Sequence, residues 1–360
     1  MIETVRDRPF VLGVLLSVAL AGAVDAPWRE ALPGYSYTFP RDHFEHPEFR
    51  TEWWYYTGNV WTDRGQRFGF ELVFFRRGET RGPTSPSNWT VRDVYLAHAA
   101  MTDAASGRFT SSERLNREGP GIAGASFKER RIWNGNWSVQ WGDDAQKLDA
   151  ITEDFRFSLN ARSEKPPVVH GEKGVSQKAS DQGRASHYVS LTRLAVSGIV
   201  ETRGRRFTVH GQAWMDHEWF TNQLKDYLTG WDWFSVQFED RTELMLFQLR
   251  RKDGSVDPFS AGTGIRANGT SRHLRRDEFD LRPLRWWRSS KTRARYPVAW
   301  VLSVPSERIQ LECRAVQDDQ ELRPGRGAPV YWEGAVDYSG SQKGVGYLEM
   351  TGYAGAVRLE

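Results

Sequence analysis

The strongest constraint on how this chain folds is a repeated pattern of short segments in which large apolar residues alternate with other residues. Alternation with a period of two places the apolar side chains on one face of a β-strand. Such segments occur at residues 68–75, 94–98, 155–159, 206–210, 234–238, 244–249, 299–304 and 309–313. Glycine-containing turn sequences stand between them, at 63–65, 105–107, 203–204 and 252–254. Helical periodicity is scarce, with one short candidate at 222–228, so the sequence predicts an all-β chain of sandwiches or barrels.

Length and composition exclude several classes of protein. At roughly 100–200 residues per domain, 360 residues predict two domains or one large one. The 49 basic and 46 acidic residues give a net charge of +3, which lacks the basic excess of a nucleic-acid binder. A single cysteine, Cys313, excludes an internal disulfide framework, a cysteine-based zinc site and an iron–sulfur cluster. Because the sequence shows no phosphate loop and no dinucleotide fingerprint, we expect no cofactor.

The N-terminus has the three parts of a secretory signal peptide. Arg6 and Arg8 precede an apolar run at 10–23 that ends in Ala21-Gly22-Ala23, a small-x-small cleavage sequence. An uncleaved membrane anchor is the alternative, although the run is short for a membrane span. No cysteine follows the run, so the segment is not a lipoprotein signal. We therefore expect a signal peptide at residues 1–23 and an exported protein, periplasmic or secreted.

Two domains are expected after the signal peptide, at residues 24–198 and 199–360, with the boundary near 195–205. The polar segment 162–186 carries several prolines and glycines and has no periodicity. It is interpreted as a long loop that crosses an opening, or as a disordered insertion. A basic segment at 272–295 surrounds Trp286 and Trp287. It is either a solvated face or a binding surface for anionic lipid or a partner.

The segment 52–58 reads EWWYYTG, a carboxylate followed by four aromatic residues. On a strand, Glu52, Trp54 and Tyr56 share one face, and Trp53 and Tyr55 the other. Both faces must then be covered by protein or by a ligand. The first set is assigned to ligand binding; the alternative is a buried strand whose glutamate is paired with an arginine.

The segment 210–219 reads HGQAWMDHEW. On a strand, His210, Trp214 and Asp216 face one side, while His217 and Trp219 face the other. Neighbours on a strand point apart, and His210 lies about 20 Å from Asp216 at roughly 3.3 Å per residue. The sequence therefore predicts no metal site here. A carboxyl group buried among aromatic rings has a raised pKa and is suited to general acid catalysis, whereas a hydrogen-bonded structural aspartate is the alternative.

Three further polar residues, Glu71, His98 and His187, are candidates for a buried or functional position. His98 shares a strand face with Leu96 and Ala100, and Glu71 shares one with Val73 and Phe75. Buried carboxylates require partners, so Glu52, Glu71 and His98 are predicted to lie inside the first domain with partners from other strands. His187 follows the polar segment and is either a proton shuttle or a residue at a strand end.

Seven segments resemble the AttH-like family of exported proteins, which is related to carotenoid 1,2-hydratases. They are FPRDH at 39–43, EWWYYTG at 52–58, FELVFFR at 70–76, SLTR at 190–193, GQAWMDHEW at 211–219, YWEGAV at 331–336 and GYLEMTGY at 346–353. The resemblance covers residues 37–353. It implies two lipocalin-like (calycin) β-barrel or curved-sandwich domains packed together.

The resemblance also implies a chemistry. In the hydratase branch, an aspartate in an aromatic-x-Asp-His motif protonates a C=C bond of a linear carotenoid. Asp216 matches that aspartate and His217 its histidine, and Trp214 stands where that branch has tyrosine. His187 is the nearest candidate for a further histidine, although Val189 stands where that branch has tryptophan. These four residues, Asp216, His187, Trp214 and His217, are the catalytic candidates.

Three functions remain open from the sequence. The first is an exported protein that binds a hydrophobic small molecule such as a lipid or terpenoid. The second is a hydratase or isomerase in which Asp216 protonates an isoprenoid or lipid C=C bond, against tryptophans that stabilise the cation. The third is an accessory periplasmic subunit of a membrane ABC transporter. The candidate ligand-binding residues are Glu52, Trp54, Tyr56, Glu71, His98, His210, Trp219 and Trp231.

Overall fold

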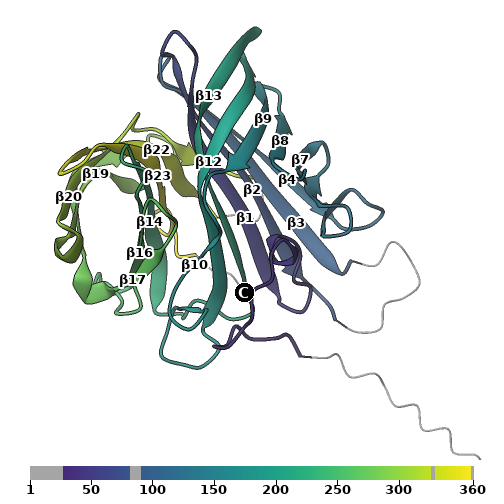
Figure 1. Cartoon of the computed structure of the whole chain (residues 1–360), viewed down its shortest axis with the longest axis vertical. Coiled ribbons are helices and arrows are strands. Elements are labelled where there is room, and N and C mark those ends of the chain that lie inside the picture. The colour runs from purple at the N-terminus through teal and green to yellow at the C-terminus, as the bar shows by residue number, and fades with distance from the viewer. Residues whose placement is uncertain (1–26, 82–90, 326–328, 358–360) are drawn as a thin grey trace, which may run out of the picture.

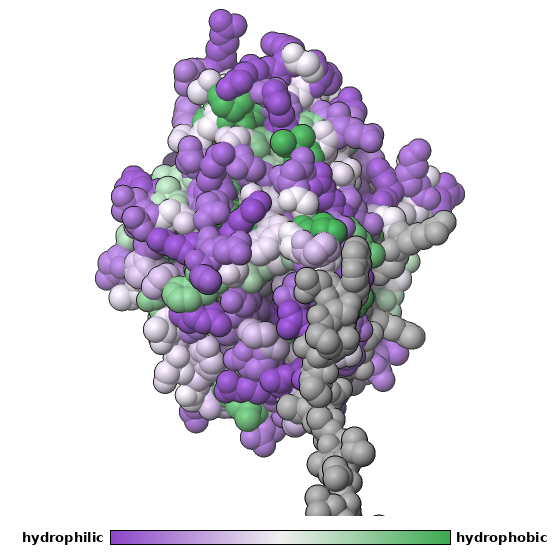
Figure 2. Space-filling model, turned by 90° about the vertical axis from the view of Figure 1, so that its right-hand side faces the viewer, coloured by the Kyte–Doolittle hydropathy of each residue, from purple (hydrophilic) through white to green (hydrophobic). Residues whose placement is uncertain are grey.

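A computed structural model describes residues 27–81, 91–325 and 329–357 (Figure 1). The signal peptide predicted at residues 1–23 lies outside the described residues. Within them, no helix combines the length and the apolar character that crossing a bilayer requires. The space-filling view in Figure 2 shows a largely hydrophilic face with scattered hydrophobic residues.

The first sheet has 13 antiparallel strands in the order β4-β3-β2-β1-β13-β12-β9-β8-β7-β6-β5, with β10 and β11 paired to β12. Its strands are β1 (Thr51–Trp61), β2 (Arg67–Gly78), β3 (Asp93–Asp103), β4 (Arg108–Arg117), β5 (Ala123–Ser126), β6 (Arg131–Asn134), β7 (Trp137–Trp141), β8 (Gln146–Ile151), β9 (Phe155–Ser163), β10 (Val168–Val169), β11 (Ser176–Gln177), β12 (Ala185–Thr202) and β13 (Arg205–Phe220). The sheet curls until β4 meets β6, where Asn116 hydrogen-bonds Asn134 at 2.6 Å.

The second sheet has 10 antiparallel strands in the order β17-β16-β15-β14-β23-β22-β20-β19-β18, with β21 paired to β22. Its strands are β14 (Leu228–Phe238), β15 (Glu243–Arg251), β16 (Ala261–Ile265), β17 (Ser271–Arg275), β18 (Asp280–Arg288), β19 (Arg295–Val304), β20 (Ile309–Ala315), β21 (Glu321–Leu322), β22 (Tyr331–Gly340) and β23 (Gly344–Met350). Figure 1 shows this sheet curled almost into a ring.

Helical structure in the described residues is limited to three short 3₁₀ turns, η1 (Arg41–His43), η2 (Arg276–Glu278) and η3 (Pro305–Glu307). The prediction of an all-β fold with two curved β domains is therefore confirmed. The short helix considered at 222–228 is wrong, because that segment is an irregular connection between the two sheets.

The boundary between the two sheets lies between Phe220 and Leu228, not at the predicted 198/199. Arg203-Gly204 is the tight turn of a long hairpin that joins β12 to β13, and both strands belong to the first sheet. A glycine turn inside a hairpin has the same sequence signature as a linker, which is why the prediction placed the boundary about 22 residues early.

Each sheet encloses its own core, and a third apolar cluster lies between the sheets. The first core includes Trp54, Tyr56 and Met215, and the second includes Trp300 and Trp332. The cluster between the sheets draws on both, for example Tyr188 and Trp214 from the first and Trp233 and Tyr347 from the second. The interiors of both barrels are thus filled with side chains.

A β-bulge in β12 changes which residues face the second sheet. The pairing of β12 with β13 shifts register between Leu191 and Leu194. Before the bulge, Tyr188 points to the cluster between the sheets; after it, Leu194 points into the first core. Bulges re-aim side chains in this way. Arg193, within the bulge, reaches Glu243 of the second sheet, Nε to Oε1 at 2.5 Å.

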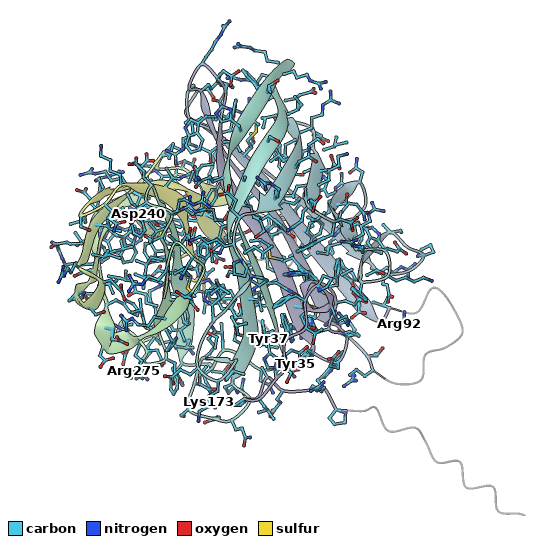
Figure 3. The ribbon with its side chains drawn as sticks, in the orientation of Figure 1. Tyr35, Tyr37, Arg92, Lys173, Asp240 and Arg275 are labelled. Carbon is cyan, nitrogen blue, oxygen red and sulfur yellow. The ribbon has the colours of Figure 1, made fainter. Side chains whose placement is uncertain are left out.

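Residues 164–184 form an ordered segment, here called the strap, that connects β9 to β12 of the first sheet. Its side chains form hydrogen bonds with the second sheet. Nζ of Lys165 lies 2.6 Å from Oε2 of Glu243, and His170 Nδ1 lies 2.8 Å from the hydroxyl of Thr263. Figure 3 shows Lys173, in this strap, at the same end of the first sheet as Tyr35 and Tyr37. The disordered interpretation of this segment is wrong.

The basic segment 272–295 includes β18, an edge strand whose Trp286 is 45% exposed.

Candidate functional site

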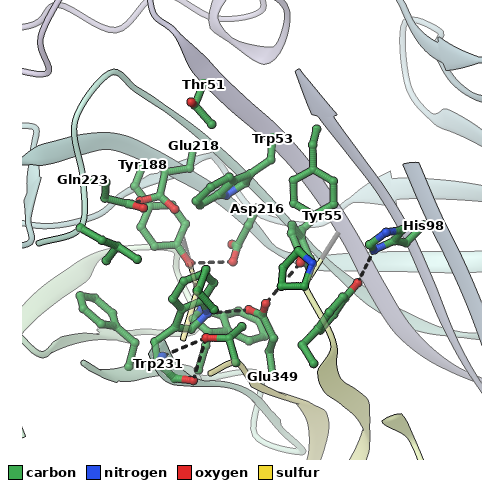
Figure 4. Close-up of a pocket in the computed structure, with 18 of the residues that line it drawn as sticks. Thr51, Trp53, Tyr55, His98, Tyr188, Asp216, Glu218, Gln223, Trp231 and Glu349 are labelled. Atoms are coloured by element: carbon green, nitrogen blue, oxygen red, sulfur yellow. Dashed lines mark hydrogen bonds between the residues drawn. The ribbon is translucent and has the colours of Figure 1, made fainter. Parts of the chain in front are cut away.

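A cavity of about 430 Å³ lies between the two sheets (Figure 4). Strands β1, β2, β3, β12 and β13 of the first sheet supply one wall, and β14, β15, β22 and β23 of the second supply the other. The lining is rich in aromatic rings, among them Trp53, Tyr55, Tyr188, Trp214, Trp231 and Trp233. A cavity of this size with a mostly aromatic lining and a few polar groups is typical of a small-molecule site.

Strand register places Asp216 in this cavity. In the antiparallel pairing, Asp216 of β13 stands opposite Tyr55 of β1 on one side and Ser190 of β12 on the other. Directly opposed residues share a sheet face, so these three point toward the second sheet. The next residue, His217, points to the other face and stacks on Trp54 with ring centroids 4.9 Å apart.

The carboxyl group of Asp216 is buried and held by three donors. The Tyr188 hydroxyl donates to Oδ2 at 2.6 Å, and Trp214 Nε1–H donates to Oδ1 at 2.6 Å. The Ser190 hydroxyl also donates to Oδ1. Burial raises the pKa of Asp216 to about 7, and the three hydrogen bonds offset only part of that effect. Asp216 therefore exchanges a proton near neutral pH.

A second acid, Glu349 of β23, reaches the cavity from the second sheet. Trp231 Nε1–H donates to its Oε2 at 2.9 Å, and the Tyr55 hydroxyl donates to Oε1 at 3.3 Å. Burial raises the pKa of Glu349 to about 7, and the charge of Asp216 adds to the increase. The cavity thus has one proton-exchanging carboxyl group on each wall.

One charged pair lies at the edge of the same cavity. Nζ of Lys178, from the strap, lies 3.6 Å from Oε1 of Glu218 and 3.9 Å from the ring centre of Phe247. Gln223 Nε2 donates to Glu218 Oε1 at 2.7 Å. Burial lowers the pKa of Lys178, while Glu218 opposes that effect. The opposite charges of Lys178 and Glu218 compensate each other at this edge, and the lining of the rest of the cavity is mostly apolar.

Glu71 and His98 also lie between the sheets, not inside the first barrel as predicted. The Tyr331 hydroxyl of the second sheet donates to Glu71 Oε1 at 2.9 Å and lies 2.6 Å from His98 Nδ1. His98 lines the cavity, whereas Glu71 is not among its lining residues and contacts the Tyr331 hydroxyl. The alternation had shown that both residues share a face with large apolar residues, but that face packs against the second sheet.

Glu52 lies on the opposite face, at one end of the first core. Its Oε1 lies 2.7 Å from His46 Nδ1 and 2.8 Å from His217 Nε2, and Arg76 Nε donates to Oε2 at 3.1 Å. Burial by itself raises the pKa of Glu52, but His46, His217 and Arg76 outweigh it and hold that pKa well below its usual range. The alternative interpretation, a buried glutamate paired with an arginine, describes this residue.

The same cluster has the spacing of metal ligands. Ligand atoms of His46, Glu52 and His217 lie within 4.8 Å of one another. Asp42 holds the other nitrogen of each ring: its carboxylate lies 3.3 Å from His46 Nε2, and its carbonyl oxygen 3.0 Å from His217 Nδ1. Arg76 already supplies a cation to Glu52, so the arrangement serves as a buried ion-pair network. Burial by itself lowers the pKa of His46, but Glu52 and Asp42 outweigh it and raise that pKa.

Several candidates from the sequence are not brought to the cavity. Trp54 and Tyr56 lie in the first core, and His217 and Trp219 lie on the same side of the sheet as Glu52. His187 packs there too, 5.6 Å from the Trp219 ring, and burial lowers its pKa to about 4. These side chains do not line the cavity with Asp216, because they alternate along their strands with the residues that do. The His210 side chain is 63% exposed, near Asp63 at the far end of β13.

Sequence reasoning missed the residues that complete the cavity. Tyr188, Ser190 and Tyr55 contact or oppose Asp216 across neighbouring strands, and Glu349 comes from the last strand of the chain. A pattern of alternation identifies the faces of one strand but not its partners or their register. The available signal was the EWWYYTG segment, in which the odd-numbered aromatic residues line the cavity.

The family model described as AttH-like matches residues 30–353. The crystal structure of the AttH protein NE1406 from Nitrosomonas europaea is similar, with 34% sequence identity and a TM-score of 0.82 over 90% of this chain and 99% of that one. No curated protein matches the sequence.

Two more distant structures share the fold. Kievitone hydratase from Nectria haematococca has 14% identity and a TM-score of 0.68, over 91% of this chain and 98% of its own. CghA has 15% identity and a TM-score of 0.55, over 93% and 97%. At these identities the likeness shows the architecture alone, two lipocalin-like domains in one chain.

Proposed function

The chain belongs to the AttH-like family, and we propose that it binds a mostly apolar small molecule between its two domains and protonates a C=C bond of that molecule. The observation that carries the proposal is the placement of Asp216. This carboxyl group faces an aromatic cavity, is buried, and has a pKa raised to about 7. A general acid is most effective when its pKa lies near the working pH.

The proposed step transfers the Asp216 proton to one alkene carbon. The π electrons form the new C–H bond, and positive charge develops on the other alkene carbon. A water molecule then adds to the cation and gives up one of its protons to yield an alcohol, whereas transfer of a proton from a neighbouring carbon to the Asp216 carboxylate yields an isomerised alkene. Tyr188, Ser190 and Trp214 stabilise the aspartate anion that remains, because each donates a hydrogen bond to it.

The aromatic lining supports a cationic intermediate. The faces of tryptophan and tyrosine attract a cation by about 0.5–2 kcal/mol each. Trp53, Tyr55, Trp231 and Trp233 line the cavity around Asp216. The name of one distant structural relative, kievitone hydratase, is that of a water-adding enzyme. An apolar alkene of terpenoid or lipid type is the substrate class that matches this lining.

The test begins with ligands extracted from the purified protein and identified by mass spectrometry. We expect an apolar alkene that gains the mass of one water, or isomerises, when incubated with the protein in isotopically labelled water. Recovery of the same compound unchanged, after incubation with folded protein at several pH values, would favour a carrier without catalytic activity. A cavity that retains no apolar compound would contradict the proposal.

The proposal predicts a rate that falls as pH rises above about 7. Asp216 holds its proton below its pKa of about 7 and loses it above. Each pH unit above about 7 then lowers the fraction of acid, and with it the rate, about tenfold. Initial rates between pH 5 and 9 measure this limb. A rate that rises throughout this range would show that the ionised carboxylate, acting as a base, is the reactive form.

Export is part of the proposed function. Removal of residues 1–23 at the Ala21-Gly22-Ala23 sequence would leave a mature chain that begins at Val24. Intact-mass measurement on protein from the native host, after separation of periplasm and cytoplasm, detects this loss. Soluble cytoplasmic protein that retains Met1 or Ile2 would contradict the prediction.

A further inference from the structure

The second acid of the cavity, Glu349, has contacts that suit it for a role of its own. Water that adds to a carbocation must lose a proton, and Asp216 in the proposed function has just become an anion on the wall formed by the first sheet. Glu349 lines the same cavity from the second sheet, between Trp231 and Tyr55 (Figure 4). It is therefore placed to act on the incoming water.

Resting on the proposed function, we propose that Glu349 is the base that takes this proton. We propose further that Tyr55, Tyr331 and His98 form a path that carries the proton from Glu349 toward the surface at Glu113. In balance, Asp216 gives a proton to carbon, the water oxygen bonds to the cation, and Glu349 takes one proton from that water. The path then returns this proton to solvent, and Asp216 takes up another.

The path is built from hydroxyl and imidazole groups that line the cavity. The Tyr55 hydroxyl lies 3.3 Å from Glu349 Oε1, and the Tyr331 side chain lines the same cavity, near enough to Tyr55 to affect the pKa of its hydroxyl. The Tyr331 hydroxyl lies 2.6 Å from His98 Nδ1. Hydroxyl and imidazole groups both donate and accept hydrogen bonds, which a proton relay requires.

His98 connects two cavities. It lines the large cavity between the sheets and also a smaller one of about 130 Å³, which Glu113 and Arg323 line as well. Its Nε2 lies 3.4 Å from Oε2 of Glu113, whose side chain is 19% exposed. A proton that reaches His98 from Tyr331 thus arrives next to a partly exposed carboxylate.

The carboxyl groups around this path have raised pKa values, and Glu349, with a pKa of about 7, is ionised in part of the molecules at neutral pH and can then accept a proton. Glu71, Glu333 and Glu349 are buried between the sheets, and Glu333 stands directly opposite Glu349 in the pairing of β22 with β23. Among the described residues, no lysine or arginine ion pair to these three is found, and neither Glu333 oxygen has a hydrogen-bond partner. Burial raises the pKa of each, and the charge of Glu349 adds to the increase at Glu71 and at Glu333. Asp216 and Glu218 face Glu349 across the cavity and act in the same direction.

The experiment reads protons on carboxyl groups without needing turnover. Infrared spectroscopy follows the C=O stretch of protonated carboxyl groups, and Glu349→Gln identifies the band that belongs to Glu349. After rapid mixing with D₂O, we expect Tyr331→Phe and Tyr55→Phe to slow the exchange of that band by about a hundredfold. Tyr56→Phe is the matched control, because the neighbouring Tyr56 hydroxyl bonds Gln146 inside the first core.

Exchange at the wild-type rate in both tyrosine variants would overturn the path. The role as base is tested separately: we expect Glu349→Gln to lower kcat by about 10²–10⁴ while ligand affinity is retained. If Glu349→Gln turns over the alkene at the wild-type rate while Asp216→Asn, assayed in the same way, is inactive, the role of Glu349 as base is overturned. If no variant and no wild-type protein turns over any alkene, the proposed function fails, and the exchange rates still decide whether the path exists.

Discussion

Replacing Asp216 with asparagine is expected to abolish turnover and leave the fold intact. Asparagine keeps the shape of the side chain but has no acidic proton, so the loss should reach about 10²–10⁴ in kcat, the usual contribution of a general acid. Its carbonyl oxygen still accepts from Ser190 and Trp214, and the Tyr188 hydroxyl can rotate to accept from the new amide. Ligand affinity should therefore remain.

The melting temperature of Asp216→Asn separates catalysis from structure. The folded-state pKa of Asp216 is raised, so its stabilising contribution is fully present below the unfolded pKa of about 3.9 and is lost as pH rises through about 7. Above pH 7 the neutral variant should melt at the wild-type temperature or higher. A lower melting temperature at pH 8, with activity reduced only in proportion to the folded fraction, would make Asp216 a structural residue.

The second large effect is expected at Glu243, which joins the two sheets. Its oxygens accept from Arg193 Nε at 2.5 Å and Lys165 Nζ at 2.6 Å, and all three side chains are buried. Glu243→Gln leaves two buried cations without their anion. Breaking a buried pair in this way costs about 3–5 kcal/mol of unfolding free energy, measured by urea denaturation.

Glu164→Gln is the matched control for Glu243→Gln. Glu164 lies next to Lys165 in the strap and pairs with Arg241 at 3.3 Å, but this pair is partly exposed. Exposed pairs contribute about 0–1 kcal/mol, so the control should unfold almost as the wild type does. Equal, small losses in both variants would show that apolar contact alone holds the sheets together.

The fold and the face of each strand could be predicted from the sequence, but the partners of each strand could not. Alternation assigned Trp53 and Tyr55 to one face of their strand and Trp54 and Tyr56 to the other. It did not show which face met the second sheet, because that depends on the partner strands. The ligand role was therefore given to Trp54 and Tyr56, which fill the first core.

The candidate site was predicted only in part, for a related reason. The environment of Asp216, buried beside tryptophan, followed from parity and from the aromatic composition of its strand. His187 and His217 were grouped with it through the family resemblance, although His217 directly follows Asp216 and must point away. The bulge at 192–193 in β12 changes parity within one strand. No period in the sequence reports such a change, since it arises from pairing with β13.

The placement of the cavity between two filled barrels affects how specificity can change. In a single barrel that encloses its ligand, the room inside follows from strand number and tilt, and a larger ligand demands a different barrel. Here the room is set by the spacing between two independently packed bodies. Substitutions at the contacts that set this spacing would enlarge, narrow or tilt the cavity without disturbing either core. In a chain of this architecture, the size and shape of the cavity can thus change through substitutions at the contacts between the two domains.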